Sequence, residues 1–311
     1  MGFGNFTSIC EKSSIPLCTV IGSVPGATVF DTGVIAHCYA RPVELANTMI
    51  FQVGNAFVHF GGLLILIIIL WNVNKKYTAI GRKEMLYFFY LAFALTVALL
   101  VVDCGVLPPS LGLYPYFVAL QLGIALATCV LLLYNGIICF QFWEDGTRKS
   151  MMSLYIILFL WFALNFIIAI ITFKLWGTSL NYDNTTGLMV VSFVLNAIIV
   201  AAYLVSQVIL VFFALRNYWL LGAILLGVFF FVAGQVMVYG VSQQICNGAK
   251  HYIDGLFFGT LCNVFTIMMI YKYWDMITLD DLEFSVANVE QGVNAFGMDD
   301  EKRASLIFLT H

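Results

Sequence analysis

Four histidines have the clearest capacity for metal or acid–base chemistry: His37, His59, His251 and His311. A zinc-dependent hydrolase inside a membrane needs about three histidine or carboxylate ligands that converge on one ion. Only His59 lies within a long apolar stretch, and no second ligand follows it at helical spacing. No motif places a nucleophile or an orienting carboxylate beside His59 either. The sequence therefore predicts a protein that is not an enzyme and has no cofactor or metal, with His59 as a hydrogen-bonded packing residue.

Cysteines and glycosylation sequons offer a second kind of chemistry. Both N-x-[ST] sequons, at Asn5 and Asn184, lie outside the apolar stretches and are candidates for N-glycosylation on a lumenal surface. Five cysteines are expected on that same side, where an oxidising compartment permits disulfides. They are Cys10, Cys18, Cys38, Cys104 and Cys246. Five is an odd number, so the pairing and the presence of a free thiol both stay open.

Ionisable groups are nearly absent from the apolar stretches, and neutral amides occur there instead. Asp103 and Asp254 are expected at the outer membrane interface, at the ends of their helices. Amides within a membrane form hydrogen bonds between helices, and small residues in a G-x-x-x-G pair let two helices approach closely. These groups either join the helices of one bundle or contact the transmembrane helices of a partner. The candidates for partner contacts are Asn55, His59, Asn135, Asn196, Gln235, Gly255, Gly259 and Asn263.

The elements that position these residues follow from composition. Of the 311 residues, 62% are hydrophobic and only 10% are charged, so lipid must be the main solvent. Hydrocarbon leaves backbone groups without partners, and the apolar runs lack the alternation of a barrel, so the spans are predicted to be helices. The expected fold is an all-α bundle of about seven transmembrane helices. The predicted spans lie near 49–71, 85–106, 114–142, 151–175, 187–215, 218–241 and 252–274.

Charge predicts the orientation of the bundle. Lys75, Lys76, Arg82 and Lys83 follow the first span and are expected to hold that end in the cytosol. The N-terminus is then lumenal or outside, and the C-terminus is cytosolic. The net charge of −3, without any basic run, argues against a nucleic-acid partner.

Three regions result from this orientation. They are a lumenal N-terminal segment (1–48), a seven-helix transmembrane domain (49–274) and an acidic cytosolic tail (275–311). In the tail, Asp281-Leu282-Glu283 fits an acidic D-x-E export signal that could bind vesicle coat components. The other interpretation is that the acidic residues only solvate the tail and repel it from an anionic leaflet.

Several blocks along the chain resemble one known family. The chain is similar to the fungal chitin synthase export chaperones, which are membrane proteins of the endoplasmic reticulum. The blocks that carry the resemblance are ICEKSSIPLC (9–18), CYARPVELANTMIF (38–51), YTAIGRKEMLYFFY (77–90), VVDCGVLPPSLGLYPYFVALQLG (101–123), FWEDGTRKSM (142–151), FFFVAGQVMVYG (229–240) and YKYWDMITLDDLEFSV (271–286). The match thins between Cys18 and Cys38 and after Val286.

The resemblance implies a function without catalytic residues. Such a protein binds a multi-spanning chitin synthase, prevents its aggregation and permits its exit from the endoplasmic reticulum, in support of cell-wall chitin synthesis. It could also accompany its client to the plasma membrane. The alternative from another class is a seven-helix receptor or another membrane scaffold protein, which the N-out topology alone would also fit.

Overall fold

The computed structural model describes residues 6–22, 33–45, 48–77, 79–140, 146–174, 184–215 and 218–278. Seven helices in these ranges are long and apolar enough to cross a membrane. The predicted all-α fold with about seven spans is therefore confirmed. The spans are α2 (Val53–Lys75), α3 (Arg82–Asp103), α4 (Tyr114–Ile138), α5 (Arg148–Lys174), a composite helix (Thr186–Phe213), α8 (Tyr218–Tyr239) and a C-terminal helix (Gly255–Thr278), called here the seventh span.

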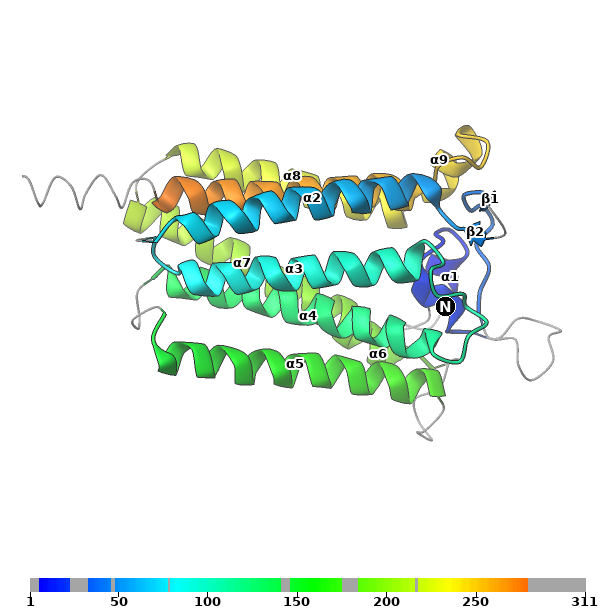
Figure 1. Ribbon diagram of the computed structural model, residues 1–311, viewed down its shortest axis with the longest axis horizontal. Helices are drawn as coiled ribbons and strands as arrows, with labels where there is room; N and C mark the ends of the chain where they lie inside the picture. The colour runs from blue at the N-terminus through cyan, green and yellow to red at the C-terminus, as the bar shows by residue number, and fades with distance from the viewer. Residues whose placement is uncertain are drawn as a thin grey trace, which may run out of the picture.

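The spans lie side by side along the long axis of the molecule (Figure 1). α2, α8 and the orange seventh span lie along one side, α5 lies along the opposite side, and α3 and α4 lie between them. α4 packs against α3, α5 and α7 (Leu195–Leu210). Half of its most apolar window is buried, against 11% for the seventh span. The seventh span therefore has the smallest buried share of the seven, and its mean hydropathy is also the lowest.

The composite fifth span changes its helical geometry twice. It begins with α6 (Thr186–Met189), continues through a π-helical turn (Val190–Val194) into α7 (Leu195–Leu210), and ends in a second π-helical turn (Val211–Leu215). π-helical turns are rare and occur mostly inside α-helices. The sequence predicted one continuous span over 187–215, and its apolar pattern carried no sign of these turns.

Short elements collect at one end of the bundle, which we call the capped end. They are α1 (Thr7–Cys10), a 3-10 turn (Pro16–Thr19), the strands β1 (Val43–Leu45) and β2 (Thr48–Ile50), and α9 (Ser242–Gly248). The two strands pair antiparallel, with Val43 opposite Ile50. Figure 1 shows these elements covering the ends of the helices where α2 begins and α3 stops.

Two buried apolar clusters hold the two ends of the bundle together. At the capped end, Phe6, Leu17 and Ile21 pack with residues of α3, α4, α5 and α6. At the opposite end, Phe89 of α3, Leu131 of α4 and Trp274 of the seventh span belong to a second cluster. The N-terminal segment is therefore packed into the fold at the capped end.

The opposite end contains the turn between α2 and α3. α3 begins after Gly81, whose φ of 64° is left-handed and suits a residue without a Cβ. Lys76, just past α2, contacts Asp275 in an ion pair and donates to the Thr278 hydroxyl at 3.1 Å. These contacts explain why the seventh span continues to Thr278, beyond the predicted end near Trp274.

Candidate functional site

A buried polar network lies where α2 begins and α3 ends. The Asn55 side chain on α2 donates to Asp103 Oδ2 on α3 at 3.1 Å, and His59 Nε2 lies 3.3 Å from the same oxygen. Asn55 and His59 are each only 1% exposed, and Asp103 is 6% exposed. One carboxylate oxygen thus holds two side chains of the neighbouring helix, which fixes α2 against α3 at the capped end.

The network extends to the N-terminal segment and the seventh span. Gln52 precedes α2 and donates to the Ser14 hydroxyl at 3.2 Å, and Ser14 donates to Asp254 Oδ2 at 2.7 Å. Asp254 in turn accepts the backbone N–H of Phe257 at 3.3 Å, in the first turn of the seventh span. Burial raises the pKa of Asp254, while the hydrogen bonds from Ser14 and from backbone N–H groups act in the opposite direction.

This network corrects two expectations from the sequence. Asp103 and Asp254 were expected at the interface, yet both are buried, and Asp254 is only 1% exposed. No carboxylate was expected beside His59, yet Asp103 lies there. Helical spacing relates only residues within α2, whereas the partner of His59 comes from the end of the next helix. The sequence around Gln52, Asn55 and Asp103 carries no signal for their contact.

The remaining amides differ in whether they are buried and whether they form hydrogen bonds within the chain. Asn135 is 8% exposed and donates to the Glu84 carbonyl oxygen at 3.5 Å. Asn196 donates to the Ser192 carbonyl oxygen of its own helix at 2.7 Å. Gln235 is half-buried and Asn263 is exposed. Within the part of the chain that the structure describes, neither of these last two side chains has a hydrogen-bond partner.

The Gly255 and Gly259 pair is covered by α8 of the same chain. A Cβ on Gly255 would lie 2.2 Å from the Met237 carbonyl oxygen, and a Cβ on Gly259 would lie 2.3 Å from Val238 Cγ2. Side chains at these positions are incompatible with the observed spacing of the two helices. The small-residue face therefore joins α8 to the seventh span.

Comparison with known proteins decides the family. A family model described as "Chitin synthase export chaperone" matches residues 2–288. The chain belongs to the chitin synthase export chaperone family. A relative of that name in Debaryomyces hansenii is 65% identical, over 99% of this chain and 100% of its own length. Relatives with the same name in Candida albicans and Saccharomyces cerevisiae are 65% and 50% identical, over 99% and 94% of this chain and 100% and 97% of their own lengths. No solved structure matches the chain.

Four of the five candidate cysteines of this chitin synthase export chaperone family member form two disulfides. Cys10 pairs with Cys18 within the N-terminal segment, and Cys38 pairs with Cys246 across 208 residues of sequence. Cys104 is a buried free thiol. Burial, with a smaller contribution from the charge of Asp103, raises the pKa of Cys104 to about 12, so this thiol stays neutral and is a poor nucleophile.

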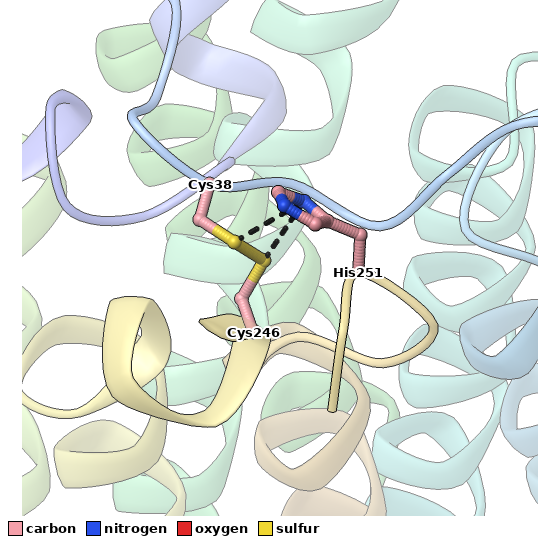
Figure 2. A group of neighbouring side chains, drawn as sticks. All are labelled: Cys38, Cys246 and His251. Carbon is pink, nitrogen blue, oxygen red and sulfur yellow. Dashed lines mark hydrogen bonds between the residues drawn. A yellow bond between two sulfur atoms is a disulfide. The ribbon is translucent and has the colours of Figure 1, made fainter. Parts of the chain in front are cut away.

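The Cys38–Cys246 bond is the centre of a three-residue cluster at the capped end. His251 lies beside both sulfur atoms, with Nδ1 at 3.3 Å from Cys38 Sγ and 3.8 Å from Cys246 Sγ (Figure 2). Among the described residues, these three form the one group of histidine, cysteine or acidic side chains whose ligand atoms gather closely enough for a metal ion. Both cysteines are buried, at 1% and 0% exposure, whereas His251 is half-buried.

The other candidate sites of this family member lie in loops or outside the described residues. Asn184 is exposed just before α6, and its side-chain oxygen accepts a hydrogen bond from Thr186, the third residue of the sequon, at 3.0 Å. Asn5, Asp281 and Glu283 lie outside the described residues.

Proposed function

We propose that this protein is a membrane chaperone of the endoplasmic reticulum that binds a chitin synthase, prevents its aggregation and permits its export. The observation that carries the proposal is the match over nearly the full length to relatives named chitin synthase export chaperone. Seven membrane-capable helices fit a protein that meets a multi-spanning client within the bilayer. Cell-wall chitin is the downstream product that depends on this step.

The proposed client contact is made by the transmembrane helices. A chitin synthase passes its polymer through the membrane, so its helices carry polar groups that need partners before assembly is complete. In hydrocarbon such groups find partners only on other helices. Gln235 and Asn263 suit this role because their amides are accessible and have no partner among the described residues.

The other candidate contact residues are more closely engaged inside the bundle. Asn55, His59 and Asn135 are buried and hydrogen-bonded to α3, and the Gly255 and Gly259 pair packs on α8. Asn196 bonds to its own helix. The glycine pair then contributes to client binding indirectly, because it sets the spacing of the two helices that present Gln235 and Asn263.

The proposed orientation places the capped end in the lumen and the opposite end in the cytosol. The basic residues Lys75, Lys76, Arg82 and Lys83 lie at the opposite end, as the positive-inside rule requires of a cytosolic end. Both disulfides and the Asn184 sequon are then lumenal. The tail beyond Thr278 is cytosolic, where Asp281 and Glu283 can recruit vesicle coat components, and the pair can travel to the plasma membrane.

Export of a tagged client tests this proposal. In fungal cells that lack the gene for this chain, a fluorescent chitin synthase is expected to stay in the endoplasmic reticulum, and cell-wall chitin is expected to fall. Expression of the chain from a plasmid should restore both. An unrelated plasma-membrane protein of many spans serves as the control and should reach the surface in all strains. A client that leaves the endoplasmic reticulum normally without this chain would refute the proposal.

A further inference from the structure

The contacts of His251 suggest chemistry beyond a structural disulfide. The backbone carbonyl oxygen of Tyr39 lies 3.2 Å from His251 Nδ1. A carbonyl oxygen can only accept a hydrogen bond, so this contact requires that Nδ1 carries the proton. The same nitrogen, His251 Nδ1, lies 3.3 Å from Cys38 Sγ. A proton donor is thus held beside one sulfur of the Cys38–Cys246 bond.

The backbone at His251 adopts an unfavourable conformation that holds the residue in this position. Lys250 and His251 have φ values of 51° and 66°, so two consecutive residues other than glycine adopt the left-handed region. Such conformations are unfavourable for residues with a Cβ and persist only where the surrounding structure imposes them. The His251 carbonyl oxygen accepts the Arg41 N–H at 2.8 Å, and the His251 N–H donates to the Cys246 carbonyl oxygen at 3.0 Å. Both contacts fix the imidazole against the sulfurs.

We propose that Cys38–Cys246 is a reversible exchange site, opened by a dithiol reductant of the thiol–disulfide oxidoreductase class with assistance from His251. A thiolate of the reductant attacks Cys246 Sγ, a new sulfur–sulfur bond forms, and the Cys38–Cys246 bond breaks. Cys38 leaves with the electron pair as a thiolate, which the Nδ1–H of His251 stabilises. The second thiol of the reductant then displaces Cys246 as a thiolate, which takes up a proton from water. The Cys38 thiolate also takes up a proton from water, so the reductant is oxidised to a disulfide and the chain gains two thiols.

The Cys38–Cys246 bond joins two distant segments of the chain at the capped end. It ties the segment that contains Cys38 to α9, and α9 leads directly into the seventh span. Both sulfurs are buried, so the attacking thiol must enter beside the half-buried His251, where Tyr252 is 72% exposed. Opening the bond removes the covalent link between the N-terminal segment and the region before the seventh span, and leaves the Ser14–Asp254 hydrogen bond between them in place. The consequence of bond opening for the client rests on the function proposed above, whereas the exchange chemistry itself does not depend on that function.

The second disulfide of the chain provides an internal control. Cys10–Cys18 is also buried, and none of the nitrogen contacts that the structure describes joins it to a histidine. The full chain, purified in detergent, is treated with dithiothreitol. Each pair is then followed by alkylation of its thiols and mass spectrometry. The ratio of the two reduction rates removes any general effect of folding or detergent on reagent access.

The decisive variant is His251→Asn, because asparagine tolerates the left-handed backbone and lacks the imidazole. We expect the rate for Cys38–Cys246, relative to Cys10–Cys18, to fall roughly tenfold, as expected for loss of a hydrogen bond to a charged thiolate. His37→Asn, which alters an exposed histidine of the same segment, should leave the ratio unchanged. An unchanged ratio in His251→Asn, or an equal fall in His37→Asn, would overturn the proposal. Stoichiometric zinc in the native protein, with Cys38 and Cys246 alkylated only after chelation, would also overturn it.

Discussion

At the scale of single residues, Asp103 matters because two buried side chains of α2 depend on one of its oxygens. Removing it in Asp103→Ala leaves the Asn55 amide and the His59 ring nitrogen without that acceptor. A buried group left unpaired costs about 1–3 kcal/mol, so we expect a clearly lower midpoint of thermal unfolding in detergent. Asp103→Asn keeps an acceptor oxygen and should lose less. Ser153→Ala, at an exposed position of α5, is the control. Equal midpoints for Asp103→Ala and Ser153→Ala would contradict this role.

Asp254 predicts a dependence of stability on pH. Because burial raises its pKa, the folded state holds a proton at pH values where the unfolded state has lost it. This contribution to stability is therefore present at low pH and is lost as pH rises through the folded-state pKa. As the pH falls from neutral toward the ordinary pKa of an aspartate, about 4, the unfolding midpoint of the wild type should gain on that of Asp254→Asn. Glu11→Gln, at an exposed acid, should behave like the wild type. Parallel pH profiles for the wild type and Asp254→Asn would rule this effect out.

At the scale of helices, the contact between α8 and the seventh span depends on close approach. In Gly259→Leu the new Cβ would meet Val238 Cγ2 at 2.3 Å, so the two helices must separate. Overpacking of this kind costs about 1–3 kcal/mol, and the unfolding midpoint should fall. Gly222→Leu on α8 is the matched control, since a Cβ there meets nothing within 4 Å. Leucine favours helix over glycine by about 1 kcal/mol, so the control should be neutral or more stable. A similar midpoint for the two variants would contradict the tight contact.

The helices were predictable from the sequence, but their partners were not. Runs of apolar residues located all seven spans, and the third was predicted to begin at Tyr114, where α4 begins. Its predicted end near 142 was too late, because α4 stops at Ile138. Apolar runs report the length of a span and say little about which side it turns toward a neighbour. The Gly255 and Gly259 motif was visible, whereas its partner α8 became clear only from the spacing of the two helices.

At the scale of the whole molecule, contacts between distant segments decide the function of each candidate residue. Cys38 and Cys246 are 208 residues apart, and spacing along the chain carries no information on such a pair. The same limit applies to His59 and Asp103, which come from different helices. The family, in contrast, was evident from blocks of sequence along the chain. Once the buried network, the glycine contact and the disulfides are assigned to the fold, Gln235 and Asn263 remain as the accessible amides among the candidates for the proposed client contact.

Direct protection of the client tests the central claim most sharply. A fluorescent chitin synthase is expressed with and without this chain, in a host that contains neither protein, and membranes are extracted with a mild detergent. Size-exclusion chromatography of the fluorescent client then measures its aggregated fraction. With this chain present, we predict a single peak that also contains the chaperone. Without the chain, we predict a large aggregated fraction. Equal aggregated fractions in the two samples, with no chaperone in the client peak, would contradict the account.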